Sequence, residues 1–166
     1  MKLIKRLAKT TLSSLGYELS KKKACAGFPT DPFEAQRRLI TNLKKSDISI
    51  LDIGANKGQT TKRYRSIFQT AEIYCFEPFP DSIAKLEEKF SGDRKIHIVP
   101  KGVAKKKDTA TFYVNERDTT NSLLPRPKSD RRYYPKCAGP KASIEVEVIG
   151  LDEFLKESNM SAVDIL

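Results

Sequence analysis

The chain contains few of the residues that build metal sites, disulfide frameworks and membrane spans. Its 166 residues include one histidine and three cysteines. Cys25, Cys75 and Cys137 are far apart in the chain, a spacing that forms neither a CxxC ligand pair nor a disulfide framework. No run approaches the roughly 18 apolar residues of a membrane span, and the N-terminus lacks the apolar core of a signal peptide. We therefore expect a protein of the reducing cytoplasm without a metal site.

The basic charge of the chain is unevenly distributed. Lysine and arginine number 31 against 21 acidic residues, which gives a net charge of +10. Residues 1–23 and 126–141 carry most of this excess, so the sequence between and after them is near neutral. No aromatic RNA-binding strand or zinc finger accompanies the charge. We therefore expect no nucleic-acid partner.

Residues 1–23 form a basic N-terminal segment that begins with a helical pattern. Leu3, Leu7 and Leu15 repeat at helical spacing over residues 1–15 while lysines occupy the other face, which predicts a short amphipathic helix. Such a helix can lie on an anionic membrane surface at the inner face, or dock its apolar stripe on the core or on a partner. The periodicity leaves both alternatives open. Residues 24–32, which contain glycine and proline, follow as a linker.

Helical and strand patterns alternate through the next part of the chain. Asp31 and Pro32 are suited to the N-cap and the first position of a helix. We predict helices over residues 32–44, from about 58 to 68, and over 80–90, and strands over residues 48–53, 72–76 and 96–99. This alternation implies a parallel sheet covered by helices on both faces.

The pattern changes after the third strand. Residues 110–114 and 144–148 alternate as strands do and predict an antiparallel hairpin appended to the sheet. Residues 115–142 between them carry four prolines and the second basic cluster. This span is too long for an ordinary loop, and it is either a substrate-covering flap or a mobile segment. Residues 151–157 predict a short final helix.

One strand-to-helix turn carries the functional signal. Leu51–Gly58 reads LDIGANKG, in which a β-branched strand ends in a turn of small residues. Glu77 ends the next strand, at the distance expected for a carboxylate that accepts hydrogen bonds from ribose hydroxyls. The two features together indicate a cofactor that contains adenosine.

The glycine pattern of this turn argues against a dinucleotide. A dinucleotide site prefers G-x-G-x-x-G because the second glycine admits the pyrophosphate. The corresponding residues are Gly54, Asn56 and Gln59, so only the first glycine is present. Asp52 adds a carboxylate two residues before the turn, close to the place of a pyrophosphate. That charge suits an ammonium or sulfonium group better.

Two motifs resemble those of a known enzyme family. Leu51–Gly58 and Phe76-Glu77-Pro78 resemble the first two motifs of the FkbM family of S-adenosylmethionine-dependent methyltransferases. Weaker likenesses extend the match over about residues 33–166; they are Gly102–Ala104, Asn121–Leu123 and Leu151-Asp152. The resemblance implies an α/β Rossmann-like methyltransferase fold, here with an incomplete parallel sheet and an appended antiparallel hairpin. It also implies O-methylation of a carbohydrate or secondary-metabolite acceptor.

The resemblance also implies a set of cofactor-binding residues: Asp52, Gly54, Ala55, Asn56, Gly58, Glu77 and Pro78. We expect Gly54 and Gly58 to leave room for the methionine part of S-adenosylmethionine, because a Cβ would occupy its volume. Asp52 would accept a hydrogen bond from the cofactor ammonium, directly or through water, and N–H groups of the turn and of the following helix would bind the cofactor carboxylate. The two oxygens of Glu77 match two ribose hydroxyls.

The residues that would serve the acceptor are less defined. Asn121 and Ser122 would contact the cofactor or the acceptor, or would simply form a turn. No catalytic base can be named from the sequence. His97 lies in a strand among apolar residues, which is typical of a packed imidazole, and Asp108 and Asp118 are no worse candidates.

The sequence reaches only part of the family pattern. In that family a further strand reads roughly Val-Asp-Ile-Leu-Lys-Ile-Asp, and this sequence ends at Val163–Leu166. We expect that strand to lie beside residues 48–53. Because the strand is cut short, a hydrophobic sheet edge would stay unpaired, and residues 1–166 alone would be poorly soluble. We also expect no methyl transfer, because the acceptor side of the cleft would be largely missing. Two alternative functions remain open. One is a truncated, non-catalytic cofactor-binding module, and the other is a peripheral membrane or polyanion-binding protein.

Overall fold

A computed structural model describes residues 29–125 and 140–166 of the chain. The predicted amphipathic helix over residues 1–15 and most of the basic part of the 115–142 span lie outside these described residues. The chain divides into two compact units, Met1–Ala35 and Gln36–Leu166. In the first unit, helix α2 (Pro32–Asn42) begins as predicted, because the side chain of Asp31 accepts a hydrogen bond of 3.0 Å from the N–H of Phe33.

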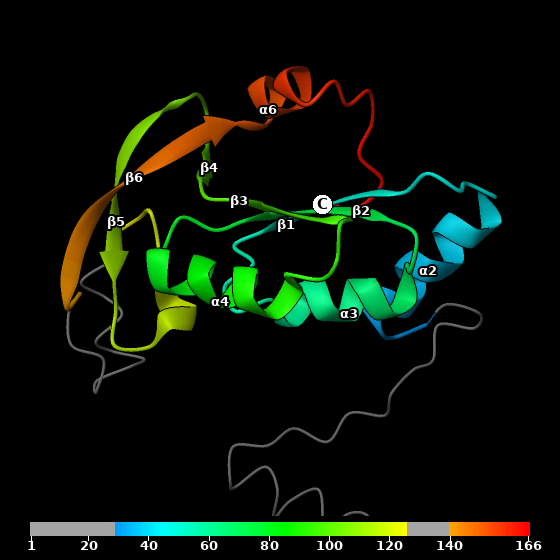
Figure 1. Cartoon of the computed structure of the whole chain (residues 1–166), viewed down its shortest axis with the longest axis horizontal. Coiled ribbons are helices and arrows are strands. Elements are labelled where there is room, and N and C mark those ends of the chain that lie inside the picture. Colours follow the sequence, from blue (N-terminus) through cyan, green and yellow to red (C-terminus); the bar gives the residue numbers. More distant parts are fainter. Residues whose placement is uncertain (1–28, 126–139) are drawn as a thin grey trace, which may run out of the picture. The chain divides into compact units, whose positions relative to one another are not determined.

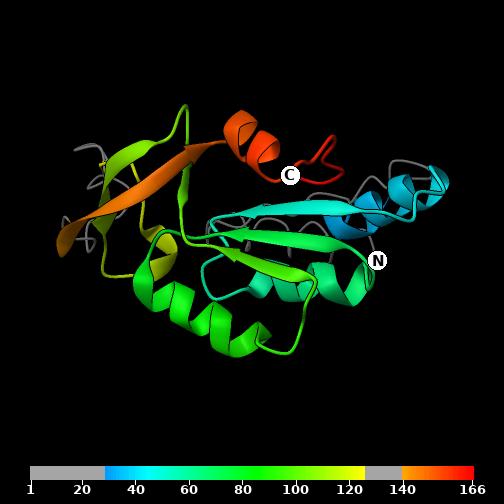
Figure 2. The same cartoon turned by 45° about the horizontal axis from the view of Figure 1, so that its top comes forward.

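The second unit contains a three-stranded parallel sheet in the order β1-β2-β3. Its strands are β1 (Ser49–Ile53), β2 (Glu72–Phe76) and β3 (Ile96–Val99). The connecting helices α3 (Gln59–Ile67) and α4 (Pro80–Phe90) lie on one face, and α6 (Leu151–Glu157) lies on the other, as Figures 1 and 2 show. The predicted alternation of strands and helices is therefore confirmed.

Burial within the strands reflects this two-sided cover. The consecutive residues Ile50 and Leu51 are both buried, although they point to opposite faces of β1. On the α6 side, the ring of Phe154 meets Phe76 edge-on at 4.7 Å and Tyr74 at 5.5 Å between centroids. Such T-shaped contacts between aromatic rings add to the stabilisation that comes from area burial. The core thus holds the carboxyl ends of β1 and β2 rigidly.

A second sheet follows the carboxyl end of β3. Strand β5 (Asp108–Val114) pairs antiparallel with β6 (Ala142–Gly150), which confirms the predicted pairing. Strand β4 (Gly102–Ala104) was not expected, because three residues show no period, and it pairs parallel with β6. The sheet order is β4-β6-β5. The pair of β5 and β6 is therefore not appended to the parallel sheet as expected, because β6 pairs with β4 on its other side. Between β5 and β6 lies the short 3-10 helix η1 (Asp118–Thr120).

The last residues of the chain pair with the outer edge of β1. Ile165 forms a parallel bridge with Ile50, and its carbonyl oxygen accepts a hydrogen bond of 2.9 Å from the N–H of Leu51. Asp164 accepts a further bond of 2.9 Å from the N–H of Ser49. The expected position of this segment beside the first strand is therefore confirmed.

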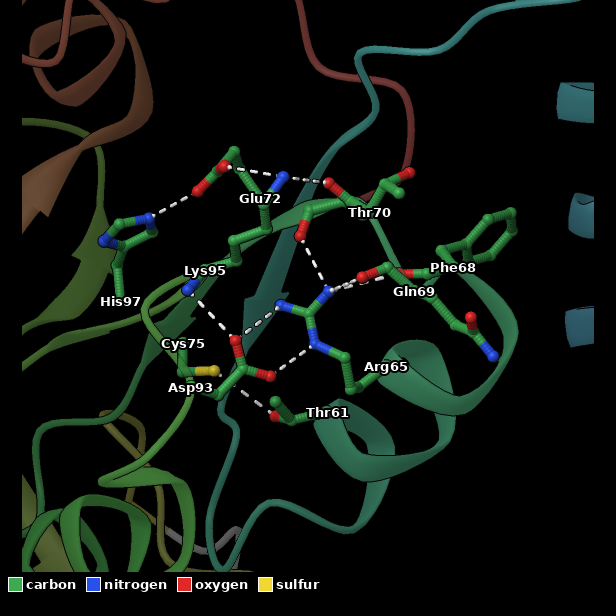
Figure 3. Close-up of polar contacts among 11 residues, drawn as sticks. Thr61, Arg65, Phe68, Gln69, Thr70, Glu72, Cys75, Asp93, Lys95 and His97 are labelled. Carbon is green, nitrogen blue, oxygen red and sulfur yellow. Dashed lines mark hydrogen bonds and ion pairs between the residues drawn. The ribbon is translucent and has the colours of Figure 1, made fainter.

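Arg65 secures the end of α3 to the parallel sheet (Figure 3). Its Nη1 donates to the carbonyl oxygens of Phe68, Gln69 and Ala71 at 3.2, 3.0 and 2.9 Å. Its Nε forms an ion pair of 2.7 Å with Oδ2 of Asp93, just before β3. These bonds satisfy carbonyl groups of the segment that joins α3 to β2. The orientation of α3 on the sheet is set at this end and by the turn at its other end.

A substitution at Gly58, just before α3, tests how closely that turn packs against α4. Its φ is +71°, and a Cβ there would lie 2.5 Å from the ring of Phe90 and 2.9 Å from Leu86. We expect Gly58→Ala to lower the free energy of unfolding by about 1 to 3 kcal/mol, the usual cost of overpacking. Chemical denaturation measures the change. Gly54→Ala is the matched control, since Gly54 also has a left-handed φ, +77°, but a Cβ there meets nothing within 4 Å, and equal losses in the two variants would contradict this packing.

Candidate functional site

The turn between β1 and α3 is bonded to the end of β2. Gly54 has a φ of +77° and Asn56 a φ of +48°, conformations that glycine and asparagine tolerate best. The N–H groups of Gly54 and Ala55 both donate to the carbonyl oxygen of Phe76, at 2.9 and 3.0 Å. The loop motif and the following strand therefore form one rigid assembly.

Glu77 completes this assembly with its side chain. Oε2 accepts a hydrogen bond of 2.8 Å from the N–H of Asn56, and Oε1 accepts one of 3.0 Å from the N–H of Phe79. Glu77 is only 5% exposed, and this burial raises the pKa of its carboxyl although the two N–H groups counteract the rise. A carboxylate has about four acceptor positions, so each oxygen keeps capacity for one more donor.

A cleft of about 340 Å³ with a mixed polar and apolar lining opens beside Glu77. It is bordered by the turn, the start of α3, the end of β2 and the segment around η1. Its lining includes Gly54, Asn56, Gln59, Thr60, Glu77, Pro78, Phe112, Asp118, Thr119 and Asn121. The structure thus brings four of the predicted cofactor residues and one predicted acceptor residue to a single cleft, and their roles stay predictions.

An apolar cavity of about 500 Å³ adjoins this cleft and shares Gly54, Pro78, Phe112 and Asn121 with it. Its other lining residues are Ile53, Phe76, Lys101, Gly102, Val103, Ala104, Ser122, Leu123 and Leu124. Apolar walls with a few polar groups are typical of small-molecule sites. Strand β4, which the sequence did not reveal, supplies part of this wall.

Of the expected N–H donors, those of the helix start border the cleft, whereas three of the turn are already bonded. The N–H groups of Gly54, Ala55 and Asn56 are bonded to the end of β2. Gln59 and Thr60, the first residues of α3, line the cleft, and N–H groups in the first turn of a helix have no intrahelical partner. The helix start rather than the turn is therefore positioned to bind an anion.

Asp52 lies beneath the cleft and is not among its lining residues. Its Oδ2 accepts a hydrogen bond of 2.5 Å from Oγ1 of Thr61 on α3, and Thr61 in turn lies 3.3 Å from Sγ of Cys75. Burial raises the pKa of Asp52, and the bonds from Thr61 oppose this rise. Its carboxylate ties β1 to α3 through Thr61, and the expected contact with the cofactor ammonium, directly or through water, stays a prediction.

Two small residues of the motif have a packing role in the structure. Ala55 is buried at 3% exposure, and Gly58 faces the side chains of Phe90 and Leu86 on α4. The explanation for Gly58 is therefore corrected, because its missing Cβ makes room for a helix. Gly54 keeps the expected geometry, since a Cβ there would meet nothing within 4 Å and the residue lines both cavities.

Asn121 and Ser122 lie at the junction of the two cavities. Oδ1 of Asn121 accepts a hydrogen bond of 2.8 Å from the N–H of Asn115, which leaves the amide nitrogen as its donor. Ser122 exchanges backbone bonds of 2.8 and 3.2 Å with Tyr113, and its Oγ accepts from the N–H of Leu124 at 3.0 Å. The pair forms a turn and lines the site at once.

The three candidate bases differ in whether they line the cleft. His97 is half-exposed, stacks on Tyr74 at 4.6 Å and lies 2.8 Å from Glu72, so it is not a packed imidazole and does not line either cavity. Asp108 is exposed and pairs with Lys106 at 3.5 Å outside both linings. Asp118 lines the cleft, but a hydrogen bond from Lys57 lowers its pKa. Its carboxylate is therefore a poor proton acceptor.

Two classes of site are not found among the described residues. In residues 29–125 and 140–166, no three His, Cys, Asp or Glu side chains gather where they could hold a metal ion. Over the same residues, no helix has the length and apolar character needed to cross a membrane.

The fold and the cleft together define the Rossmann-like α/β class of protein. The sequence model of the methyltransferase FkbM domain matches residues 52–166. The match spans more than half of the chain, which therefore belongs to the FkbM methyltransferase family, as the sequence motifs predicted.

One relative of known name has a similar but longer sequence. The chain is 26% identical over 147 residues to the 2-O-methyltransferase NoeI of Sinorhizobium fredii (strain NBRC 101917 / NGR234). This alignment covers 83% of the chain and 59% of NoeI, so the chain spans less than two thirds of that relative. Among solved structures, the glycopeptide N-methyltransferase MtfA complexed with sinefungin is matched over 90% of this chain and 84% of that one, at 12% identity and a TM-score of 0.31.

The burial of Asp52 predicts a pH dependence of stability. A carboxyl whose pKa is raised on folding binds its proton more tightly in the folded state, so stability falls as pH rises from about 3.9, the unfolded value, through the raised folded value. We expect the melting temperature of the wild type to fall relative to Asp52→Asn across this window. Asparagine still accepts the bond from Thr61 but does not titrate. If the melting temperatures of the two proteins changed with pH in the same way from acid to neutral pH, the burial of this charge would be contradicted.

Proposed function

We propose that this chain binds S-adenosylmethionine and belongs to an enzyme that methylates an oxygen of a carbohydrate or secondary-metabolite acceptor. Membership of the FkbM methyltransferase family supports the methyltransferase class. The cofactor site and the acceptor are argued from the geometry of the cleft and from the relative described above.

The arrangement of Glu77 carries the proposal. Its carboxylate is buried at the end of β2, and both oxygens are oriented by backbone N–H groups of Asn56 and Phe79. No cation pairs with it among the described residues. A buried carboxylate without a cationic partner is costly, and two adjacent ribose hydroxyls would satisfy its remaining acceptor positions.

The surrounding residues fit the rest of the cofactor. The space next to Gly54 admits a ligand close to the backbone, and the start of α3 presents N–H groups to a carboxylate. The buried carboxyls of Asp52 and Glu77 favour a ligand with positive charge when they are ionised. A sulfonium and an ammonium meet this condition, whereas a pyrophosphate does not.

The residues of the cleft position and shield the reactants. When bound, S-adenosylmethionine supplies an electrophilic methyl group for direct transfer to the acceptor oxygen. Glu77 would hold the ribose and the first turn of α3 the carboxylate, so that the nucleoside and amino-acid ends are both fixed. The cavity lined by Ile53, Phe112 and Leu123 gives the site an apolar wall beside the cleft. Orientation of this kind can supply several kcal/mol of the barrier without a nucleophile on the protein.

The acceptor class is supported by a relative and not by the cleft itself. NoeI is named a 2-O-methyltransferase, which favours a hydroxyl oxygen as acceptor. Transfer of a labelled methyl group to a panel of glycans and natural products, using the protein isolated from its natural source, tests this part. Labelling of amines alone would contradict it.

Cofactor binding is tested through Glu77. We expect calorimetry to detect binding of S-adenosylhomocysteine, and Glu77→Ala to weaken it by about 1 to 3 kcal/mol, because polar groups would be left without partners. Glu72→Ala is the matched control, since Glu72 is the acid at the other end of β2 and pairs with Lys95 and His97 away from the cleft. This control should bind as the wild type does.

Three outcomes distinguish the alternatives. Unchanged affinity in Glu77→Ala, or tighter binding of NAD than of S-adenosylhomocysteine, would overturn the cofactor assignment. Binding without transfer in the protein from its natural source would favour the non-catalytic cofactor-binding module. Binding to anionic vesicles or polyanions without binding to the cofactor would favour the peripheral membrane or polyanion-binding protein.

A further inference from the structure

The segment that follows β5 is built as an ordered loop beside the cleft. We call residues 115–122 the cleft loop. Asn115 is buried at 5% exposure, and it donates from its N–H to Asn121 and from Nδ2 to the carbonyl oxygen of Thr120, at 2.8 and 2.5 Å. The N–H of Asn121 also donates to the carbonyl oxygen of Asp118 at 3.1 Å. The loop is therefore cross-linked by its own hydrogen bonds.

The base of the cleft loop is attached to the segment that carries Glu77. Phe112, three residues before the loop, stacks on Phe79 with ring centroids 6.2 Å apart. Phe79 is also the residue whose N–H donates to Glu77. This apolar contact fixes the strand end of the loop, but it does not hold the far end, where Asp118, Thr119 and Asn121 line the cleft.

An ion pair holds that far end. Nζ of Lys57 contacts Oδ2 of Asp118, which joins the turn between β1 and α3 to η1 across 61 positions of the chain. Lys57 follows Asn56, whose N–H is bonded to Glu77. Asp118 also accepts from the N–H of Thr119 through its other oxygen at 2.7 Å. The pair thus connects the rigid part of the site to the loop that borders it.

The charges around this pair favour its formation. A hydrogen bond from Lys57 is the main cause that lowers the pKa of Asp118, with smaller contributions from the N–H of Thr119 and from Lys85. Both side chains of the pair are partly exposed, at 41% for Lys57 and 32% for Asp118. An exposed ion pair contributes little to the stability of the whole protein. We therefore expect this pair to affect mainly the position of the cleft loop.

We propose that Lys57 and Asp118 are positioning residues that hold the cleft loop against the bound cofactor and slow its release. This inference rests on the proposed function, because it assumes that the cleft binds S-adenosylmethionine or its product. The pair itself does not contact the reacting atoms. It keeps Thr119 and Asn121 in place along the wall that faces Glu77, so the ligand leaves only when the loop moves.

The dissociation rate of S-adenosylhomocysteine tests this inference. We expect Asp118→Asn to raise the rate by about two- to five-fold, the range that an exposed ion pair supports. Asparagine keeps the oxygen that accepts from Thr119, so only the ion pair is lost. The wild-type rate should rise with salt because screening weakens an exposed pair, and the rate of Asp118→Asn should depend on salt much less.

Two further variants separate positioning from general damage. The charge reversal Lys57→Asp with Asp118→Lys should restore a slow, salt-dependent rate, whereas each single reversal should not. Asp108→Asn is the matched control, since it removes an exposed pair with Lys106 at 3.5 Å that lies outside both cavities. It should leave the dissociation rate unchanged.

Hydrogen exchange of the ligand-free protein gives an independent measurement. The amides of Thr120 and Asn121, which bond to carbonyl groups inside the loop, should exchange faster in Asp118→Asn than in the wild type or in Asp108→Asn. If the wild type binds S-adenosylhomocysteine and Asp118→Asn alters neither the rate nor the exchange, the inference fails and the proposed function stands. If the wild type does not bind, both fail together.

Discussion

The structure of the site depends on the hydrogen bonds between the first turn and the end of β2. One carbonyl oxygen, that of Phe76, accepts from Gly54 and Ala55, and the carboxylate of Glu77 accepts from Asn56. These bonds hold the backbone in the left-handed conformations that the turn requires. They also orient the carboxylate before any ligand arrives, which reduces the ordering that binding must impose.

Two acidic residues are buried at this junction, and they have different structural roles. Asp52 accepts from Thr61 and connects β1 to α3, whereas Glu77 borders the cleft. Burial raises the pKa of both carboxyls, and the charge of Asp52 further raises the pKa of Glu77. Keeping two such groups costs stability. That cost is consistent with a site shaped for binding, because functional sites commonly retain groups that a core would exclude.

The second sheet completes the site from sequence positions far from the motifs. Strand β5 brings Phe112 against Phe79, and the cleft loop brings Asp118 to Lys57. The wall formed in this way faces the carboxyl ends of β1 and β2, where ligands of open α/β sheets bind. The apolar cavity next to the cleft exists only because β4 and the residues after the cleft loop lie together there.

The sequence by itself determined the parallel sheet, the pairing of β5 with β6, the family and the location of Glu77, because these follow from local periodicity and from a motif of adjacent residues. The adjacent residues Asp31 and Pro32 also identified the N-cap of α2. Only the tertiary structure decided that Asp52 turns toward Thr61, that Gly58 makes room for Phe90, and that Lys57 meets Asp118. Each of these depends on which face of an element a side chain occupies and on what another element places opposite it. Those are contacts between distant residues, and no pattern along the chain encodes their distances.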